Sequence, residues 1–511
     1  MNTALSHDTI LPNWLLRCAE NQPNHLAIQC GSVCWSFTEL RCQADHLAYQ
    51  LAARGVSKES RVALLATNGL PFVVTVHALM RLGAILVPLN TRLTQQELAW
   101  QLSDVRATFL CSDQRYADIA QQLADEITPL AHVLITSDVQ QNVLVADQTE
   151  GPVIALQETI GLDAVHSIMY TSGTTGHPKG VLITYGMLCW GALGSALTLG
   201  HYADDCWLAC LPLFHVSGLT VLMRSVINGI SVNLHEKFEP EAVNRAIFDE
   251  RVTIISVVAV VLQRMLDALD TPGAQGRYPV TLRCVLLGGG PAPRPLLERC
   301  AAKNIPVVQT YGLTESCAQA VTLLPADALH KLGSAGKPLF PVQLRILTED
   351  YQPVPPGKPG IIHLQGPTIT PGYDHRPEAT ARAFHNGWFT TGDLGYVDEE
   401  GYLYVLDRRT DLIISGGENV YPAEIEAVLM SHPEVEEAGV CGVDDPQWGQ
   451  LPIAFVRLRE GSNLTATELL PYVTQHLAHY KRPKAIYAVA QLPRNSAGKL
   501  LRRELPGLLP S

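Results

Sequence analysis

Apolar and polar positions alternate between helical spacing and short strand-like runs up to about residue 330. Residues 37–56 carry apolar side chains at helical spacing, and Gly55 near their end is a typical helix stop. The apolar runs at 61–68 and 83–90 predict buried strands. No repeat of about 20–50 residues is evident. This alternation predicts parallel sheets whose faces are covered by helices.

The pattern changes past residue 330. Residues 361–367 and 401–409 are apolar stretches that predict strands of a more antiparallel region, with a glycine at the turn of a hairpin. Residues 421–432 predict a helix, because a proline stands in the first turn and apolar residues then share one face. The last part of the chain repeats a small α+β pattern. We therefore place a large domain up to about Asp407 and a small one after it.

The composition is that of a folded, multidomain chain. Of 511 residues, 47% are hydrophobic and 17% charged, which allows large cores and excludes a disordered protein. The length suggests roughly three domains. The formal net charge of −12 is spread along the sequence without a basic stripe, which argues against nucleic acid as the main partner. A local phosphate site needs only a few donors, so this charge does not exclude ATP.

Targeting signals and metal-binding cysteines are not expected. The N-terminus lacks a positively charged region followed by an apolar core, so it does not predict a secretory signal. The longest apolar run, 252–262, is too short for a membrane span and predicts a buried strand with its flank. The 12 cysteines form no CxxC pair, and the two CxxxC pairs lack a partner pair at zinc-finger spacing. We expect reduced core thiols in a cytoplasmic protein.

One stretch, YTSGTTGHPKGV at 170–181, gathers hydroxyls and glycines in front of a lysine. Hydroxyl donors, closely approachable backbone and one cation are what a polyphosphate needs. The glycine spacing is not that of a Walker A loop, and Lys179 is followed by Gly180 rather than by Ser or Thr. The candidate phosphate ligands are Thr171, Ser172, Gly173, Thr174, Thr175, Gly176 and Lys179.

Three further segments place residues suited to a nucleotide at the end of a predicted strand. LLGGGPAP, at 286–293, ends in three glycines, against which a flat ring can lie. Thr314 and Glu315 follow the next strand, and a carboxylate such as Glu315 can hold Mg²⁺. Asp393 follows a glycine at a strand end, where a carboxylate can take both hydroxyls of a ribose. Taken singly, the three glycines are also explained by a tight turn, and the carboxylates by acids at the surface.

Three other candidates are ambiguous when each is taken alone. His215 stands between apolar residues, which favours a core histidine. Gly416 and Gly417 form a turn after a charged junction. Lys499 lies in a polar, glycine-containing loop before a predicted terminal helix, where a solvated lysine is the simpler interpretation.

Six motifs together resemble the adenylate-forming superfamily, the acyl-CoA synthetases and their relatives, in the order in which that family carries them. They are YTSGTTGHPKGV, LPLFHVSG, YGLTES, TGDLG, DRRTDLIISGGENVYPAEIE and NSAGKLLRREL. The resemblance runs from about Leu11 to Leu505, so a chance match is negligible. Within the superfamily the chain is most similar to the o-succinylbenzoate–CoA ligases of menaquinone biosynthesis, notably in CLPLFHVSGLTVLMRSVINGISVNLHEKF.

The resemblance implies an α/β fold: a large N-terminal domain of layered α/β subdomains with a β-barrel-like subdomain, and a small mobile α+β lid. The implied boundaries are 1–407 for the adenylation domain, 408–410 for the hinge and 411–511 for the lid. It implies two half-reactions: a carboxylate attacks ATP to give an acyl-adenylate and pyrophosphate, and CoA then displaces AMP. The partners are therefore a small carboxylic acid, ATP with Mg²⁺, and CoA, with no nucleic acid and no membrane span. Relatives are often dimers.

The resemblance also implies residue roles in the chemistry. The loop 171–176 and Lys179 would hold the β- and γ-phosphates. Lys499 would bridge the acyl carboxylate and the α-phosphate, a task of positioning as much as of charge. Glu315 would bind Mg²⁺, with Thr314 beside the α-phosphate.

The remaining implied roles concern the rest of the nucleotide and CoA. Asp393 and Arg408 would hold the ribose. Gly416 and Gly417 would shape the pantetheine tunnel after the lid turns about a pivot near 409–410, where Thr410 replaces the Asp or Lys of many relatives. The residues that would flank adenine and part of the acyl pocket are Gly288, Gly289, Gly290, Pro291, Tyr311 and Gly312.

Substrate choice centres on Arg224. o-Succinylbenzoate has a second carboxylate that needs a desolvated cation or several donors. Arg224 matches a basic position of the subfamily on a predicted helix past the pocket, with Ser217 and Thr220 as further donors and His215 at the acyl or thiol entrance. An arginine on the outer face of that helix is the alternative. A general aryl- or fatty-acyl-CoA ligase, an acyl-AMP ligase serving a carrier protein and a non-catalytic sensor also stay open.

Overall fold

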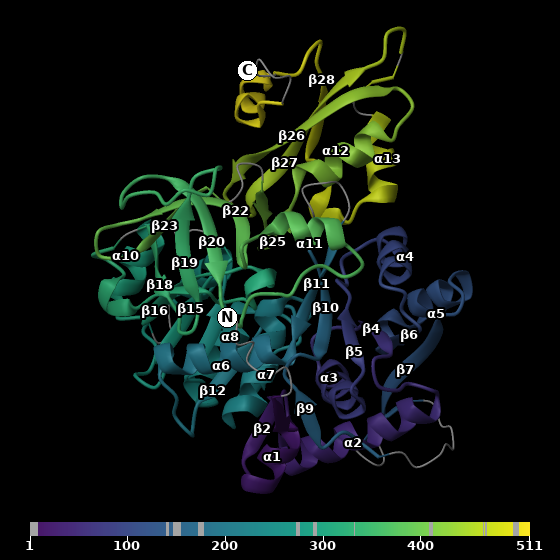
Figure 1. Cartoon of the computed structure of the whole chain (residues 1–511), viewed down its shortest axis with the longest axis vertical. Helices are drawn as coiled ribbons and strands as arrows, with labels where there is room; N and C mark the ends of the chain where they lie inside the picture. Colours follow the sequence, from purple (N-terminus) through teal and green to yellow (C-terminus); the bar gives the residue numbers. More distant parts are fainter. Residues whose placement is uncertain are drawn as a thin grey trace.

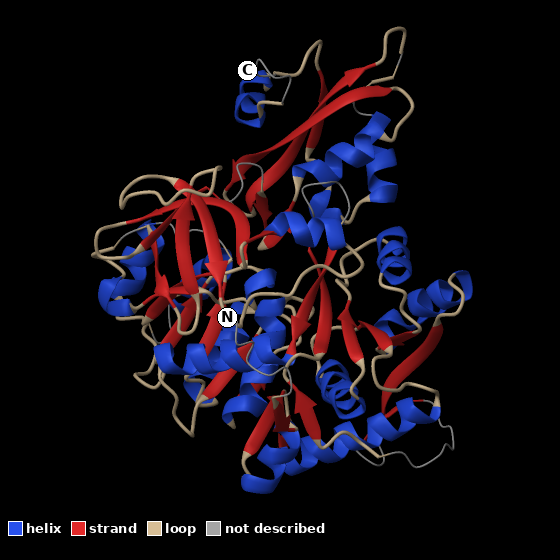
Figure 2. Ribbon diagram, in the orientation of Figure 1, coloured by secondary structure: helices blue, strands red, loops and turns tan. Residues whose placement is uncertain are grey.

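The computed structural model describes residues 9–138, 143–146, 155–171, 178–271, 276–289, 294–331, 333–407, 412–462, 464–465, 468–493 and 500–510. Two large sheets with helices on their faces form the main body, and a smaller sheet with its own helices stands above them (Figures 1 and 2). In the part of the chain that is described, no helix is both long and apolar enough to cross a membrane.

The first sheet of the body has the strand order β11-β10-β5-β4-β6-β7-β8. Side chains of each strand alternate between its faces, so Val62 and Leu64 pack with α2 and α3 while Ala63 and Leu65 pack with α4 and α5. Both faces are therefore buried, as the continuous apolar runs predict. The elements are β4 (Arg61–Leu65), β5 (Ile85–Pro88), β6 (Phe109–Ser112), β7 (Ala131–Asp138), β8 (Val143–Ala146), β10 (Val165–Thr171), β11 (Lys179–Thr184), α2 (Phe37–Ala53), α3 (Leu70–Leu82), α4 (Gln95–Asp104), η1 (Gln114–Tyr116) and α5 (Ala117–Glu126).

The second sheet is parallel from β16 through β15, β14, β12 and β13 to β2, and antiparallel from β17 to β19. Helices α8, α9 and α10 cover one face of its parallel part, and α1, α6 and α7 cover the other. Its strands are β2 (Leu26–Cys30), β3 (Val33–Ser36), β12 (Cys206–Ala209), β13 (Ser231–Leu234), β14 (Ile254–Val257), β15 (Cys284–Leu287), β16 (Val307–Tyr311), β17 (Val321–Leu323), β18 (Ser334–Pro338), β19 (Gln343–Leu347), β20 (Gly360–Gln365), β21 (Phe384–His385), β22 (Trp388–Val397) and β23 (Leu403–Asp407).

The helices of this part follow the expected order along the chain. They are α1 (Trp14–Asn21), α6 (Tyr185–Leu199), α7 (Val216–Asn228), α8 (Pro240–Asp249), α9 (Ala259–Leu269), α10 (Arg294–Ala302), η2 (Thr314–Ser316), η3 (Pro325–Asp327) and α11 (Pro377–Ala383). A separate strand pair joins β1 (Ile10–Pro12) to β9 (Thr159–Gly161).

The C-terminal lobe is built on a sheet with strand order β25-β24-β27-β26, to which β28 adds beside β27. Helices α12 and α13 pack on one face, and the C-terminal segment packs on the other. Its elements are β24 (Ile413–Ser415), β25 (Glu418–Val420), α12 (Pro422–Met430), β26 (Val435–Asp445), β27 (Gly449–Leu458), α13 (Leu469–His476), η5 (His479–Lys481), β28 (Ala485–Ala488) and η6 (Arg502–Leu508).

One local prediction needs correction, and two are confirmed. The buried strand predicted within the apolar run 252–262 is β14, and the last part of that run begins α9 at Ala259. The predicted terminal helix is the 3₁₀ helix η6, with Pro506 inside it. The hairpin between β22 and β23 is confirmed, and Gly401 at its turn has φ of +84°, which favours glycine.

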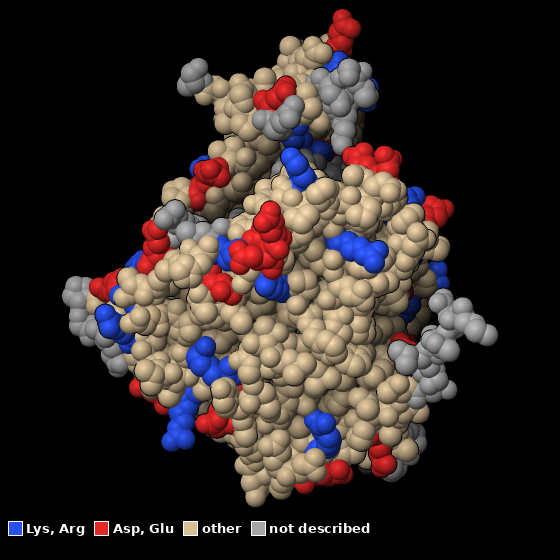
Figure 3. Space-filling model, turned by 60° about the vertical axis from the view of Figure 1, so that its left-hand side comes forward, with Lys and Arg blue, Asp and Glu red and all other residues tan. Residues whose placement is uncertain are grey.

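Charged side chains on the face in Figure 3 are scattered, with Lys and Arg beside Asp and Glu. The narrow C-terminal lobe stands over the broader body in this view. No continuous basic stripe is seen on this face.

Candidate active site

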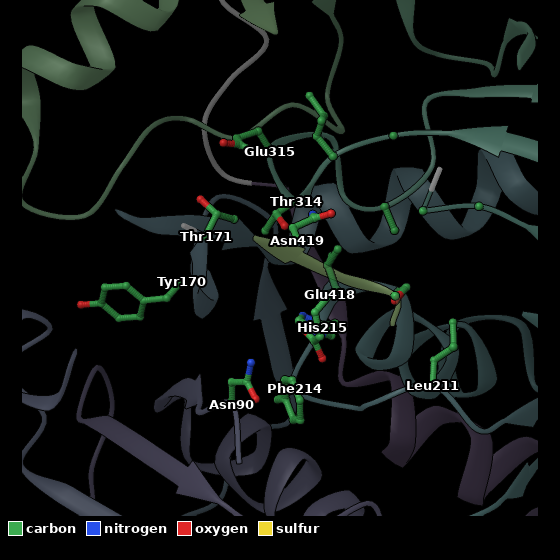
Figure 4. A pocket seen from close by; sticks show the side chains of 18 of the residues that line it. Asn90, Tyr170, Thr171, Leu211, Phe214, His215, Thr314, Glu315, Glu418 and Asn419 are labelled. Atoms are coloured by element: carbon green, nitrogen blue, oxygen red, sulfur yellow. Dashed lines mark hydrogen bonds and ion pairs between the residues drawn. The ribbon is translucent and has the colours of Figure 1, made fainter. Parts of the chain in front are cut away.

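A pocket lies where the carboxyl ends of the parallel strands meet the C-terminal lobe. Parallel strands bring the residues that follow them to one edge of the sheet, so segments far apart in sequence converge there. Figure 4 shows His215 and Glu418 side by side among the residues that line it. The predicted site residues that line the pocket are Thr171, Lys179, His215, Ser217, Thr220, Arg224, Gly288, Gly289, Gly312, Thr314, Glu315, Asp393 and Gly417.

Several predicted site residues lie outside the described residues. These are Ser172, Gly173, Thr174, Thr175, Gly176, Gly290, Pro291, Arg408 and Lys499, together with the predicted hinge at 408–410. Their roles stay predictions.

Two predicted site residues are described but do not line the pocket. Tyr311 is buried behind it, and its hydroxyl donates a hydrogen bond of 2.7 Å to Asp393 Oδ2. Gly416 lies against Trp448, where an added Cβ would come within 2.7 Å of the indole. Its φ of +58° also favours glycine, so local packing explains this residue without a ligand. Neither the adenine role of Tyr311 nor the tunnel role of Gly416 is tested by these positions.

One end of the pocket suits phosphate. Thr171 pairs with Lys179 across the antiparallel strands β10 and β11, so a hydroxyl and a cation stand side by side. Lys179 Nζ lies 5.3 Å from the ring centre of Tyr373, and the Tyr373 hydroxyl donates to Glu315 Oε1 at 2.9 Å. A cation beside a carboxylate is the arrangement that a metal-bound polyphosphate needs.

The middle of the pocket suits a nucleoside. Asp393 is 3% exposed, with one carboxylate oxygen accepting from Tyr311. Gly288 and Gly289 also line the pocket, and an added Cβ would lie 3.0 Å from Thr310 or 2.9 Å from Val258, so neighbouring side chains leave little room for a larger residue at either position. The buried carboxylate of Asp393 beside them is suited to ribose hydroxyls.

The far end of the pocket holds a buried cation. Arg224, on α7, is 3% exposed, and its guanidinium carbon lies 4.9 Å from the ring centre of Trp207. Its Nη2 donates to Gln319 Oε1 at 3.1 Å, while Nε has no hydrogen-bond partner among the described residues. Burial lowers the pKa of Arg224 to about 10. The predicted position of Arg224 on the pocket side of its helix is confirmed, and the outer-face alternative is wrong.

The C-terminal lobe closes the pocket through β25. Glu418 accepts from Arg92 Nη1 at 2.6 Å, and its other oxygen lies 3.0 Å from His215 Nε2. Burial raises the pKa of Glu418, but the charges of His215 and Arg92 outweigh it and hold the pKa below its ordinary value. At neutral pH Glu418 is therefore a carboxylate that links the two lobes.

A second link between the lobes is made by Lys481. It is 3% exposed, and its Nζ donates to Glu97 at 2.8 Å and to Glu424 at 2.7 Å. Burial alone would lower the pKa of Lys481, but the neighbouring carboxylates raise it, so the ammonium stays charged. Nearby, Asn90 donates to the Tyr480 hydroxyl at 3.2 Å.

Sequence reasoning missed the polar partners that hold this site together. Glu418 stands inside the quoted motif GGENVYP, but its contact with His215 is a tertiary feature. Glu97 shows a local signal only, since it closes a capping box with Thr94 at the start of α4. Gln319 carried no signal in the sequence, because only the folded chain brings it to Arg224.

Comparison with known families covers most of the chain. Residues 15–374 match the model of the AMP-binding enzyme family, and residues 424–499 match that of the AMP-binding enzyme C-terminal domain. A 2-succinylbenzoate–CoA ligase of Geobacillus sp. (strain WCH70) is 50% identical over 503 residues, which is 98% of each chain. The enzyme of the same name from Geobacillus kaustophilus (strain HTA426) is 52% identical over 502 residues, covering 98% of this chain and 99% of the relative.

Solved structures of o-succinylbenzoate–CoA synthetase from Bacillus subtilis are similar over the same length. A double mutant bound to a product analogue, OSB-NCoA, has a TM-score of 0.90 at 43% identity and covers 98% of this chain and 99% of its own. The complex with the acyl-adenylate OSB-AMP scores 0.74 at 43% identity, with 97% and 98% covered. The complex with ATP and magnesium scores 0.73 at 43% identity, with 98% and 100% covered.

Proposed function

Because the chain belongs to the AMP-binding enzyme family, we propose that it joins o-succinylbenzoate to CoA at the expense of ATP, a step of menaquinone biosynthesis. It is an AMP-forming acid–CoA ligase, and ATP, Mg²⁺ and CoA are what it uses. The products are o-succinylbenzoyl-CoA, AMP and pyrophosphate. The 12 cysteines are free thiols, which fits a cytoplasmic enzyme.

The first half-reaction brings two anions together. A substrate carboxylate oxygen attacks the α-phosphorus of ATP, and the bond to the β-phosphate oxygen breaks to release pyrophosphate. Thr171 and Lys179 would hold the phosphates, and Asp393 the ribose, which fixes the α-phosphorus opposite the acyl end. Lys499 would offset the repulsion between the carboxylate and the phosphate.

The pocket fits magnesium carried on a triphosphate. No group of three or more His, Cys, Asp or Glu that could hold an ion by themselves occurs among the described residues. Mg²⁺ usually takes one or two carboxylates with substrate phosphates and water, so Glu315 is a sufficient protein ligand. The metal would neutralise charge on the phosphates.

The second half-reaction needs a path for the thiol. The CoA sulfur attacks the acyl carbon, its proton is lost, and the bond from that carbon to the AMP oxygen breaks. Gly417 lines the pocket with φ of +84°, and an added Cβ would come within 3.4 Å of Val258. At equal sequence identity the chain matches the CoA-analogue complex far better than the OSB-AMP or ATP complexes, which supports a lid placed for thioester formation.

The burial of Arg224 in the pocket is the observation that supports o-succinylbenzoate as the acid substrate. A buried guanidinium without a carboxylate partner among the described residues lacks compensation for its desolvation. A fatty-acyl chain would leave it unpaired, whereas the second carboxylate of o-succinylbenzoate would pair with it. Thr220 and Ser217 line the same part of the pocket and can add donors.

The test of this function is CoA-dependent AMP release with o-succinylbenzoate beside benzoate and octanoate. We expect kcat/KM for o-succinylbenzoate to exceed the other two by about 100-fold or more, since a site built for a polar group rejects analogues that lack it. Equal rates with benzoate or octanoate would instead identify a general aryl- or fatty-acyl ligase. If the adenylate forms but CoA does not cause the release of AMP, the chain would be identified as an acyl-AMP ligase that serves a carrier protein.

The domain boundaries belong to the same proposal. β23 ends at Asp407 and β24 begins at Ile413, which supports a hinge at 408–410 between the last strand of the body and the first strand of the lobe. Residues 411–511 would then move as the lid.

Lys481→Met is expected to slow thioester formation about tenfold and to leave adenylate formation within about twofold. Without the ammonium, the carboxylates of Glu97 and Glu424 lose the cation that lies between them and repel each other when the lid is docked as in this structure. Pyrophosphate exchange measures the first half-reaction, and CoA-dependent consumption of preformed adenylate measures the second. Lys237→Met is the matched control, because Lys237 pairs with Glu239 on the surface. Equal losses in both half-reactions would refute this role for Lys481.

A further inference from the structure

The charge balance around Arg224 differs from that around Arg81, another deeply buried arginine. Arg81 is 6% exposed and its Nε donates to Asp45 at 2.6 Å, so its charge is compensated within the protein. Arg224 is equally buried, but the group that accepts from it is the uncharged amide of Gln319. The thiols of Cys317 and Cys284 lie near it, and burial raises the pKa of each to about 12, so they too are neutral.

The amide of Gln319 is itself held in one orientation. Gln319 is 3% exposed, and its Nε2 donates to Thr322 Oγ1 at 2.9 Å. Thr322 in turn lies 3.4 Å from Thr310 Oγ1, whose hydroxyl donates to the main chain of Val321. With the NH₂ group committed to Thr322, the carbonyl oxygen faces Arg224. Gln319 and Arg224 both line the pocket, so this pair is placed where it can contact a bound acyl group.

We infer that Gln319 is a specificity-determining residue: its uncharged carbonyl positions Arg224 while leaving the guanidinium charge for the second carboxylate of the substrate. This inference rests on the proposed function and adds to it a reason why position 319 must be neutral. A carboxylate of nearly the same shape would pair with Arg224 and repel the incoming anion. The difference between an amide and a carboxylate at position 319 would thus decide whether the pocket prefers an acid with a second carboxylate or an aryl acid without one.

The test compares Gln319→Glu with Gln319→Met, using o-succinylbenzoate and benzoate as substrates. Gln319→Glu is expected to raise KM for o-succinylbenzoate about twentyfold or more, with KM for ATP and for benzoate within about threefold of wild type. Gln319→Met removes the hydrogen bond but adds no charge, so its KM for o-succinylbenzoate should rise less than about fivefold. Equal losses in the two variants, or none in Gln319→Glu, would overturn the inference.

Two further readouts separate failure of the inference from failure of the proposed function. Arg224→Met, assayed alongside, must raise KM for o-succinylbenzoate; if it does not, the Arg224 assignment fails and the inference fails with it. If Arg224→Met behaves as expected while Gln319→Glu and Gln319→Met match each other, only the inference fails. Thermal unfolding adds a check, because a carboxylate facing Arg224 should keep Gln319→Glu at least as stable as Gln319→Met. A Gln319→Glu variant that does not fold would contradict the inference.

Discussion

Lys499→Ala is expected to slow acyl-adenylate formation by about 1,000-fold, because it removes the cation proposed to lie between the carboxylate and the α-phosphate. Transfer from preformed adenylate to CoA is expected to stay within about threefold of wild type. The two anions no longer need to meet in that half-reaction, so the lysine has no charge to offset there.

The lid contacts support this separation of the half-reactions. The lobe meets the pocket through β25, η5 and residues that flank β24 and β25. The lining residues of the lobe are Leu412, Gly417, Glu418, Asn419, Tyr421, Tyr480 and Lys481. Leu492 and Leu500, which flank residues 493–499 in sequence, instead pack in the hydrophobic cluster on the other face of the lobe sheet. If Lys499 acts at the pocket, that face of the lobe would have to turn toward it, as domain closure in stages allows.

Pyrophosphate exchange and single-turnover consumption of synthetic o-succinylbenzoyl-AMP measure the two steps independently. Lys237→Ala serves as the control for loss of an exposed lysine. An equal decrease in both steps would rule out the two-position lid, and an unchanged exchange rate would remove Lys499 from the chemistry.

Arg224→Ala is expected to raise KM for o-succinylbenzoate about 100-fold and to leave KM for ATP within about twofold. The substitution removes the buried guanidinium, so the second carboxylate of the substrate must be desolvated without a partner. The nucleotide end of the pocket, at Asp393 and Lys179, keeps its contacts.

Steady-state kinetics with each substrate varied in turn check this expectation. Arg264→Ala is the matched control, because Arg264 is exposed and packs over Phe238 outside the pocket. KM values that rise together for the acid and for ATP would point to a general loss of structure and not to recognition of the acid.

Much of the fold follows from patterns that are local in sequence. The continuous apolar runs became strands buried on both faces, such as β4 and β5, and the helical spacing at 37–56 became α2. The boundaries between elements are harder to predict where one apolar run contains both a strand and a helix, as at β14 and α9. The residues of the two elements there are equally hydrophobic.

The sequence predicts those parts of the site whose residues come at or after the end of a strand. Thr171 ends β10, and Gly288 and Thr314 follow β15 and β16, as predicted. Asp393 was predicted at a strand end but lies inside β22, and the fold still brings it to the same pocket. Pairings between lobes were not predictable, because nothing near Lys481 in sequence indicates that its partner is Glu97. Such contacts depend on how the lid docks.

The central claim is that Arg224 binds the free second carboxylate of the acyl substrate. The most direct measurement is kcat/KM for o-succinylbenzoate and for its ester at that carboxylate, in wild type and in Arg224→Ala. We expect a preference of about 100-fold for the acid in wild type and almost none in the variant, since the ester and the substitution remove the same ion pair. A preference for the acid that persists undiminished in Arg224→Ala would contradict it.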